Sequence, residues 1–181
     1  MQGEGLNYFI EKLDERGELI RIKSFTDPVL EITEVTDRIS KQKGGGQALL
    51  FEDTGTQFPV LINALGSEKR MALAFRSESV QAVETEIDSL FRKMTNQPAT
   101  FFDKLKMLSQ LREFSSWMPR KTNQKGKCQE VVITNPDLGI FPILKCWPAD
   151  GGRFITLPCV HTVDPETGAP NVGMYRMQVF G

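Results

Sequence analysis

Hydrophobic periodicity changes once along this chain, at the polar and basic segment Arg120–Lys127. Before this segment, apolar residues recur at helical spacing and alternate with short β-rich runs. After it, only strand-like patterns remain, separated by turns rich in Gly, Pro and Asp. The sequence therefore predicts an α+β protein with an N-terminal α/β domain over 1–119, a linker over 120–127 and a β-rich domain beginning in 128–181. The four positive charges of the linker are interpreted as a solvated connection rather than an anion site.

The N-terminal part is predicted to alternate helices with short strands. Predicted helices cover Leu6–Leu13, Leu30–Ile39, Ser67–Phe75, Val80–Met94 and Phe101–Phe114, and predicted strands cover Glu18–Ile22, Ala48–Phe51 and Val60–Asn63. The triple glycine Gly44–Gly46 is interpreted as a turn, because no Lys-Ser or Lys-Thr pair follows it as a phosphate-binding loop requires. The apolar stripe of the helix over 80–94 is interpreted as a core-facing surface rather than a cofactor site.

Three strands are predicted in the C-terminal part, over Gln129–Thr134, Phe154–Val163 and Asn171–Phe180. The last two would form a hairpin around the loop Asp164–Gly168. Two strands alone do not make a stable sheet. The second domain is therefore expected to be completed either by a longer chain or by partner chains.

Charge and hydropathy narrow the classes of function. The net charge is -1 and the pI about 5.9, so no polyanion-binding tail is indicated and nucleic acid is a poor candidate partner. The sequence has no apolar run of about 18 residues and no secretory leader pattern, which predicts a cytoplasmic protein. Membrane association through a lipophilic substrate is the alternative.

The cysteines and the single histidine give little sign of chemistry. Cys128, Cys146 and Cys159 are odd in number and lack C-x-x-C spacing, so they are predicted to be reduced and buried. His161 is predicted to be a strand residue with a hydrogen-bonded ring, rather than a metal ligand or general base.

The strongest functional signal lies in Asn171–Gln178, which combines an amide, a glycine and a guanidinium. Gly173 removes a side chain from the predicted strand, which often marks a bulge or the close approach of a ligand. Arg176 offers a planar fork of donors suited to phosphate or carboxylate. On a continuous strand, alternate side chains share a face: Asn171, Gly173 and Tyr175 on one side, and Val172, Met174 and Arg176 on the other. A half-buried strand with a surface arginine and a capping asparagine remains the alternative interpretation.

Two blocks of sequence point to a family. The first runs W-P-x-D-G-G-x-F-I-T from Trp147 to Thr156, and the second runs N-x-G-M-Y-R-M-Q from Asn171 to Gln178. In order and separation they closely resemble the UbiD family, the reversible (de)carboxylases of aromatic and unsaturated acids that use prenylated FMN. The likeness extends through essentially the whole chain, including Ile62–Arg70. It is strongest to the branch of 3-octaprenyl-4-hydroxybenzoate carboxy-lyase and the menaquinone-biosynthesis decarboxylase.

The resemblance implies an α/β N-terminal domain, a central flavin-binding split β-barrel and a C-terminal α/β domain that mediates homo-oligomerisation. This chain would hold the first domain and the opening strands of the barrel. The family's metal-binding His and Glu, and the two acids of its Glu-Arg-Glu network, would lie beyond Gly181. By this resemblance the 181-residue chain alone is expected to be inactive.

The resemblance also implies roles for single residues. Asn171 would ligate the divalent metal, usually Mn²⁺, that holds the cofactor phosphate, and the Val172 carbonyl would contribute to a K⁺ site. Arg176 would be the catalytic arginine that holds the substrate carboxylate. Trp147 and Asp150–Gly152 are expected to shape a turn rather than to touch substrate. The residues expected at the cofactor are Asn171, Val172, Gly173, Met174, Tyr175, Arg176 and Gln178.

Two functions follow as hypotheses. In the first, the full-length protein (de)carboxylates a hydroxybenzoate- or naphthoate-like acid in quinone biosynthesis, with a flavin prenyltransferase supplying the cofactor. In the second, the chain is a non-catalytic α/β module for ligand binding or assembly.

Overall fold

The computed structural model describes residues 5–95, 115, 118 and 123–180. The chain divides into two compact units, one made of 1–80 with 137–181 and the other of 81–136. The mixture of helices and small sheets confirms the predicted α+β class. The helix predicted over 101–114 lies outside the described residues. Within the described part of the chain, no helix is both long and apolar enough to cross a membrane.

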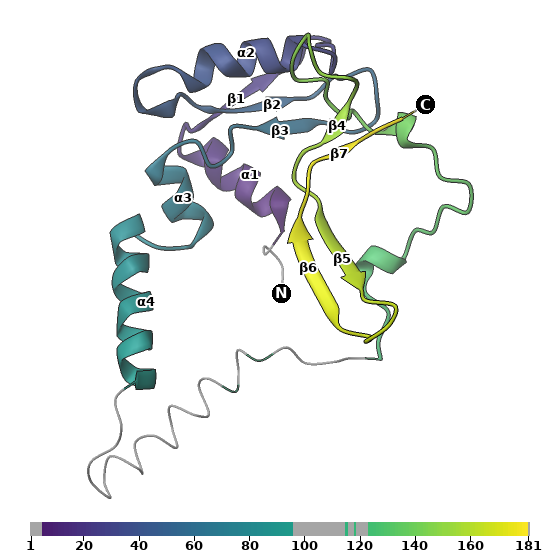
Figure 1. Ribbon diagram of the computed structural model, residues 1–181. Helices are drawn as coiled ribbons and strands as arrows, with labels where there is room; N and C mark the ends of the chain where they lie inside the picture. The colour runs from purple at the N-terminus through teal and green to yellow at the C-terminus, as the bar shows by residue number, and fades with distance from the viewer. Residues whose placement is uncertain (1–4, 96–114, 116–117, 119–122, 181) are drawn as a thin grey trace, which may run out of the picture. The chain divides into compact units, whose positions relative to one another are not determined.

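The first unit contains a three-stranded sheet in the order β1-β2-β3 (Figure 1). Strand β1 (Leu19–Ile22) is parallel to β2 (Ala48–Phe51), and β3 (Val60–Ile62) is antiparallel to β2. Parallel neighbours need a crossover connection, and helix α2 (Glu31–Ser40) provides it between β1 and β2. The three strands predicted for this part are confirmed.

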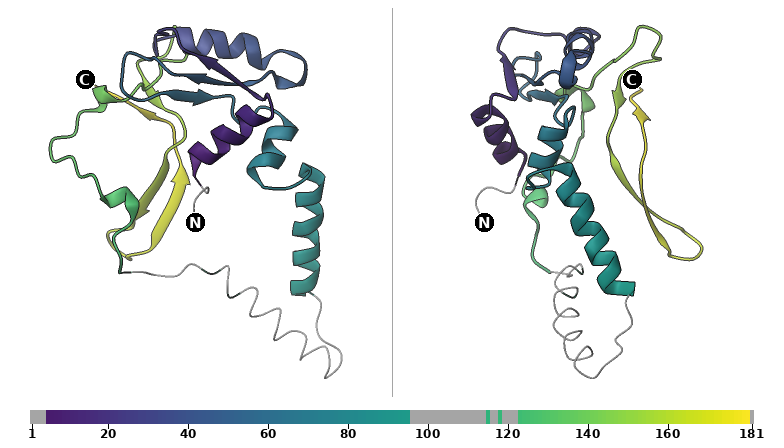
Figure 2. Two further views of the ribbon diagram at one scale, coloured as in Figure 1. Left: turned by 180° about the vertical axis from the view of Figure 1, so that it is seen from behind. Right: turned by 90° about the vertical axis from the view of Figure 1, so that its left-hand side faces the viewer.

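Helices cover both faces of this sheet. Helix α1 (Leu6–Glu15) and α2 lie on opposite sides of the strands in the views of Figures 1 and 2. Side chains of β2 alternate between the two layers, so Ala48 and Leu50 pack with Leu13, whereas Leu49 and Phe51 pack with Ile32. All of these side chains are buried. Strand β2 is therefore the centre of the core.

Two hydrogen bonds from backbone N–H groups to acidic side chains close the turn before α2. The Val29 N–H donates to the Asp27 carboxylate at 2.7 Å, and the Asp27 N–H donates to the Glu31 carboxylate at 2.9 Å. Acidic side chains satisfy free N–H groups at a helix start and also favour the positive end of its dipole. Helix α2 begins at Glu31, one residue after the predicted start at Leu30.

The triple glycine forms a turn, as predicted. All three φ angles are positive, at 80° for Gly44, 83° for Gly45 and 58° for Gly46, a region that residues with a Cβ rarely adopt. The Asn63 side chain anchors this turn by donating from Nδ2 to the Gly45 carbonyl at 2.8 Å and to the Gln47 carbonyl at 2.9 Å.

Arg70 ties the same turn to the start of β1. It lies on helix α3 (Glu68–Ala74), which begins after Ser67 as predicted, and its side chain is fully buried. Its Nη1 donates to the Gly46 carbonyl at 2.7 Å and to the Glu18 carboxylate at 2.9 Å. A buried charge that is paired and hydrogen-bonded in this way holds distant segments together.

The second unit contains helix α4 (Val80–Thr95), the helix predicted after Ser79. Its apolar stripe does not form a core within the described residues, because Ile87 is 47% exposed and Phe91 is 63% exposed. The segment that the sequence places next, over 101–114, lies outside the described residues. The interpretation of the stripe as a core-facing surface therefore remains a prediction.

The strand predicted over Gln129–Thr134 is absent. A short 3-10 helix, η2 (Lys127–Gln129), stands at its start, and residues 130–134 form no strand. Val131 and Val132 are 78% and 77% exposed. The β-branched run meets no partner strand among the described residues, and strand propensity without pairing does not produce a strand.

The long C-terminal hairpin is present but interrupted. Strand β5 (Cys159–Val163) pairs with β6 (Pro170–Met174), and the short β4 (Phe154–Ile155) pairs with β7 (Met177–Gln178), both antiparallel. Figure 2 shows β5 and β6 running side by side as one ribbon. Between the two ladders, residues 156–158 face only Tyr175 and Arg176. The prediction of two continuous strands is therefore wrong at this point. The two facing segments differ in length by one residue, and Pro158 has no N–H to donate to a ladder.

The C-terminal residues join the first unit through the segment before β4. The Leu30 N–H donates to the Lys145 carbonyl at 3.0 Å, and the Lys145 N–H donates to the Pro28 carbonyl at 3.2 Å. Leu144 packs on the α2 side of the core. Residues far apart in sequence therefore build one compact unit, and the domain boundary over 120–127 remains a prediction.

Candidate functional site

Arg176 lies at the interruption between β6 and β7, and its side chain contacts two residues of the first sequence block. The guanidinium stacks on the Phe154 ring, with Cζ 3.7 Å from the ring centroid. Its Nη2 donates to the Asp150 carboxylate at 2.9 Å. Phe154 is paired with Gln178, two residues after Arg176, so the register brings Arg176 diagonally across the ladder from this ring.

Asp150 has two tasks in this arrangement. Its Oδ2 accepts the Trp147 N–H at 3.1 Å, and its own N–H donates to the Trp147 carbonyl at 3.0 Å, so it closes a turn as predicted. The same oxygen binds Arg176, a contact that sequence reasoning missed. Burial by itself would raise the pKa of the Asp150 carboxyl, but hydrogen bonds from Arg176 and from the Trp147 and Cys146 backbone hold that pKa below its ordinary value. Asp150 is therefore an anion beside the guanidinium.

Gln178 covers the two glycines that follow Asp150. A Cβ on Gly151 would lie 3.1 Å from the Gln178 amide nitrogen, and one on Gly152 would lie 3.4 Å from it. The glycines thus let the Gln178 side chain rest directly on the turn. Of the residues predicted at the cofactor, the structure brings Arg176 and Gln178 together around the turn Trp147–Gly152.

The other predicted residues lie along β6. Asn171 pairs with Thr162 and Val172 pairs with His161, and both are exposed. The Asn171 amide makes no hydrogen bond within the described part of the chain, so its oxygen can accept a cation or a donor. A free amide oxygen fits a hard cation such as Mn²⁺ as one ligand among several.

Gly173 is closely approached by a ring of its own chain. A Cβ at this position would lie 2.5 Å from Cε2 of the Tyr175 ring, so Tyr175 shares the face of Gly173, as strand alternation predicts. Met174, the last residue of β6, is 71% exposed. The strand ends there, which leaves Arg176 outside the predicted alternation.

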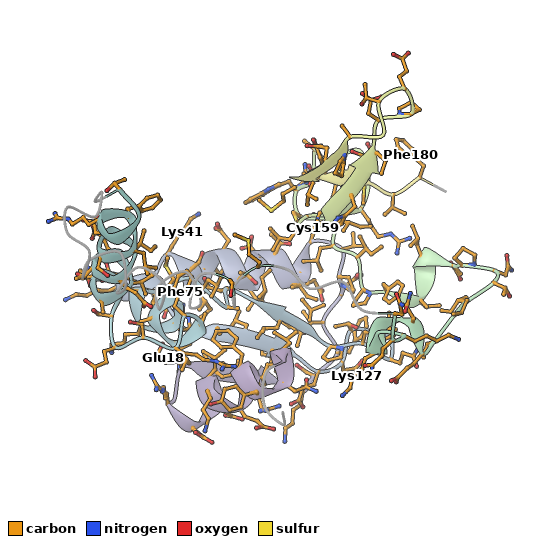
Figure 3. All side chains as sticks on the ribbon, turned by 90° about the horizontal axis from the view of Figure 1, so that it is seen from below. Glu18, Lys41, Phe75, Lys127, Cys159 and Phe180 are labelled. Carbon is orange, nitrogen blue, oxygen red and sulfur yellow. The ribbon has the colours of Figure 1, made fainter. Side chains whose placement is uncertain are left out.

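The described residues contain no cluster of three or more His, Cys, Asp or Glu side chains that could hold a metal. His161 lies on β5 as predicted, is exposed, and has its Nε2 3.8 Å from the Cys159 sulfur. Cys146 and Cys159 are both unpaired, but Cys159, labelled in Figure 3, is exposed rather than buried. The prediction of burial is wrong for Cys159, because no described layer covers this face of β5, and Cys146 is only half-buried. The side chain of Cys128 lies outside the described residues.

Two cavities of the first unit were not predicted from sequence. The first, of about 610 Å³, is mainly apolar and lies where Trp147 and Pro148 meet the start of α2, with Phe25 and Leu30 in its lining. Trp147 connects it to the turn, since its N–H binds Asp150 while its side chain lines the cavity. Segments more than a hundred residues apart line the cavity, so no local sequence motif predicts it.

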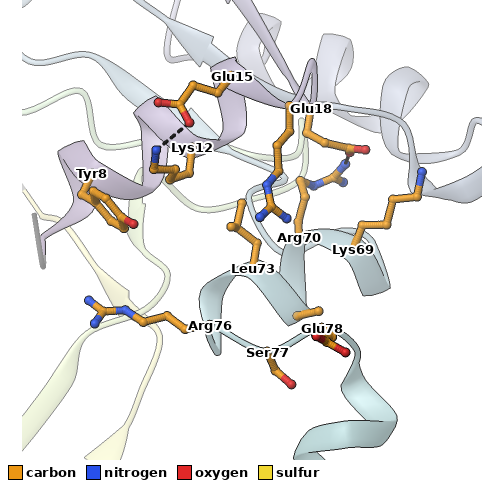
Figure 4. Close-up of a pocket in the computed structure, with 12 residues that line it drawn as sticks. Tyr8, Lys12, Glu15, Glu18, Lys69, Arg70, Leu73, Arg76, Ser77 and Glu78 are labelled. Carbon is orange, nitrogen blue, oxygen red and sulfur yellow. Dashed lines mark hydrogen bonds and ion pairs between the residues drawn. The ribbon is translucent and has the colours of Figure 1, made fainter.

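The second cavity, of about 730 Å³, lies between α1 and the α3 region (Figure 4). Its lining carries both signs of charge, and the pairs Lys12–Glu15 and Arg70–Glu18 are part of it. Figure 4 shows Arg70 reaching from α3 toward Glu18. None of the residues predicted to be functional lines this cavity.

Comparison with protein families gives two matches. Residues 10–90 match the 3-octaprenyl-4-hydroxybenzoate carboxy-lyase N-terminal domain. Residues 120–181 match the 3-octaprenyl-4-hydroxybenzoate carboxy-lyase Rift-related domain. Both belong to UbiD, and together they cover both sequence blocks.

Two relatives resemble nearly the whole chain. It is 48% identical over 181 residues to an uncharacterized protein of Archaeoglobus fulgidus, covering 99% of this chain and 36% of that protein. It is 47% identical over 177 residues to an uncharacterized protein of Aquifex aeolicus, covering 97% and 36%. The chain therefore spans 36% of the length of these relatives.

Solved structures give the same assignment. The vanillic acid decarboxylase of Sedimentibacter hydroxybenzoicus in its closed form matches with a TM-score of 0.71 and 26% identity, over 97% of this chain and 35% of that one. An evolved dimeric form of the UbiD-class enzyme HmfF from Pelotomaculum thermopropionicum, in complex with prFMN, matches with a TM-score of 0.65 and 26% identity, over 97% and 36%. The chain belongs to the UbiD family and corresponds to the N-terminal portion of its members.

Proposed function

We propose that the full-length protein containing this chain is a carboxy-lyase that (de)carboxylates an aromatic acid with prenylated FMN. The observation that carries the proposal is the guanidinium of Arg176, which is held by Asp150 and Phe154 within the two sequence blocks of the family. Two solved relatives support it, one being a vanillic acid decarboxylase and the other a UbiD-class enzyme in complex with prFMN.

Arg176 is the residue that binds the substrate carboxylate. Within the Arg176 guanidinium, only Nη2 donates a hydrogen bond to Asp150. The Arg176 Nε and Nη1 make no hydrogen bond to the described residues. These N–H groups can grip a carboxylate, and a fixed grip orients the bond to the ring for loss of CO₂. The side chain is 44% exposed, so a ligand can reach it.

Asn171 contributes to cofactor binding through a cation. Its exposed amide oxygen would be one ligand for Mn²⁺, and this cation would neutralise the cofactor phosphate. The Val172 carbonyl would contribute to a K⁺ site, and Gly173, Met174, Tyr175 and Gln178 would lie beside the cofactor. Prenylated FMN supplies the electron sink for decarboxylation when it is bound.

The finer assignments follow from the family branch that the sequence most resembles. The substrate is a hydroxybenzoate- or naphthoate-like acid of ubiquinone or menaquinone biosynthesis. A flavin prenyltransferase supplies the cofactor, and the enzyme works in the cytoplasm as a homo-oligomer. The chain contains one of the metal ligands and the arginine, so residues outside it complete the site and the 181 residues alone are inactive.

The test compares the full-length protein, prepared with prenylated FMN, with its Asn171→Ala and Arg176→Ala variants. We expect Asn171→Ala to lose metal-dependent flavin retention, because it removes a cation ligand. We expect Arg176→Ala to keep the flavin and to lose decarboxylation by about 100-fold or more, since the carboxylate is no longer oriented. Flavin absorbance after gel filtration and CO₂ release measure the two effects.

Normal binding and turnover by both variants would contradict this division of roles. The family likeness would then concern the fold, and a non-catalytic ligand-binding or assembly module would be the better description.

A further inference from the structure

We propose that Asp150 and Phe154 are positioning residues that fix the orientation of the Arg176 guanidinium for its carboxylate ligand. This inference rests on the proposed function of Arg176. It assigns a second role to Asp150, whose sequence context indicates only a turn.

The guanidinium is held from two directions. The guanidinium carbon Cζ lies over the Phe154 ring, 3.7 Å from the ring centroid, and Nη2 donates to the Asp150 carboxylate at 2.9 Å. A planar group that is stacked on one face and hydrogen-bonded at one edge cannot rotate freely about its long side chain. The donors at Nε and Nη1, which bind nothing within the described residues, therefore point in a defined direction.

Asp150, which holds the guanidinium, is itself fixed by its surroundings. The Asp150 side chain is only 13% exposed, and its Oδ2 also accepts the Trp147 N–H at 3.1 Å. Gln178 rests on the next two glycines. The Phe154 N–H donates to the Leu144 carbonyl at 2.9 Å, and this bond ties Asp150 and Phe154, called the seat of Arg176 below, to the core. An arginine on a mobile hairpin would lose orientational entropy on binding its ligand, and this seat removes most of that cost beforehand.

Both residues of the seat lie within this chain. Asp150 and Phe154 lie in the first sequence block and Arg176 in the second, 26 residues after Asp150. The co-occurrence of the two blocks thus has a physical reason in this contact.

The test uses the full-length enzyme with prenylated FMN and compares Asp150→Asn with Asp150→Glu. Asparagine keeps an oxygen that can accept the Trp147 N–H but loses the charge that binds Arg176, whereas glutamate keeps the charge but is one methylene longer. A positioning role predicts that Asp150→Asn lowers kcat, per bound flavin, about tenfold and that Asp150→Glu lowers it less. We expect KM to change less than about threefold in Asp150→Asn, because the lost charge also repelled the substrate carboxylate.

A role in the turn alone predicts the opposite order. Asp150→Asn would then match the wild type and Asp150→Glu would be impaired, and this result, or equal effects of the two, would overturn the proposal. Asp164→Asn is the matched control, since the Asp164 carboxylate also accepts backbone N–H groups, from Glu166 and Thr167, without a guanidinium partner. We expect its kcat to equal that of the wild type.

A second variant covers the other side of the seat. Phe154→Leu keeps an apolar side chain but removes the ring under the guanidinium, and we expect it to lower kcat about threefold to tenfold with the flavin retained. Full kcat in both Phe154→Leu and Asp150→Asn would refute the seat.

The failure of the proposed function is distinguishable from the failure of this inference. A wild-type enzyme that decarboxylates no aromatic acid contradicts the proposed function. The seat is then judged from crystal structures of the wild type and of Asp150→Asn. Displacement of the guanidinium from the Phe154 ring in the variant supports the seat, and an unchanged guanidinium refutes it.

Discussion

At the scale of single residues, Arg70 shows how a buried charge organises the first unit. Its side chain is fully buried and donates to a backbone carbonyl of the triple-glycine turn and to Glu18. Its Nε and Nη2 have no hydrogen-bond partner among the described residues. The side chain thus stabilises the fold through Nη1. Its removal would leave the Glu18 carboxylate and the Gly46 carbonyl without this donor.

Replacement of Arg70 by methionine is expected to lower the free energy of unfolding by about 2–4 kcal/mol. Breaking a buried ion pair leaves a charge without its partner, and here the cost is reduced because the Glu18 side chain is 22% exposed. Denaturant unfolding of the protein measures the change. Lys69→Met is the matched control, since Lys69 is exposed and its side chain makes no hydrogen bond or ion pair within the described residues, so its effect should stay within about 0.5 kcal/mol. Equal effects of the two substitutions would argue against a stabilising role of the Arg70 hydrogen bonds.

The residue scale also shows what sequence reasoning could find in the candidate site. Arg176 and Asn171 stood out because their side chains suit anions and cations in a stretch that otherwise reads as a strand. For its partner Asp150 the sequence predicts only a turn, because the neighbours Gly151 and Gly152 favour that interpretation. No spacing rule links a residue of the turn before β4 to a residue 26 positions later that lies between two ladders, so the pair could not be predicted from local pattern.

At the scale of elements, turns and strands differ in how well sequence determines them. The triple glycine predicts a turn because three consecutive glycines favour positive φ, and the structure uses all three in this way. The sequence predicts two continuous hairpin strands, over 154–163 and 171–180, on either side of the loop 164–168. Their interruption depends on the mismatch between two facing segments, which neither segment reveals alone.

The glycine turn allows a matched pair of substitutions. Gly44→Ala and Gly45→Ala both place a Cβ at positive φ, which costs about 1–2 kcal/mol. At Gly44 the Cβ would meet nothing within 4 Å, whereas at Gly45 it would collide with the carbonyl oxygen of Gly66. We expect Gly45→Ala to lower the free energy of unfolding by about 2 kcal/mol more than Gly44→Ala does, as measured by denaturant unfolding. Similar losses for the two variants would show that the turn moves to accommodate the extra methyl group.

At the scale of the whole molecule, the domain boundary predicted over 120–127 leads to a proteolysis experiment. The described part of this segment, 123–127, is exposed, and exposed polar segments between domains are the preferred sites of nicking. Limited proteolysis of the protein is therefore expected to cut first within 120–127, with the fragments identified by mass spectrometry. First cleavage near Val80 would favour the boundary between the compact units instead, and cleavage inside the helices with protection of 120–127 would contradict the prediction.

The sequence by itself determined the helices and strands of residues 6–75, the α+β class and the family, because these depend on local periodicity and on two specific blocks of residues. The tertiary structure alone decided that residues 137–180 pack with residues 5–80, that the C-terminal hairpin breaks at Tyr175 and Arg176, and that Arg176 rests between Asp150 and Phe154. The physical reason is that periodicity records only which face of an element is apolar. Contacts between distant segments depend on register and on close packing, which arise when the elements meet.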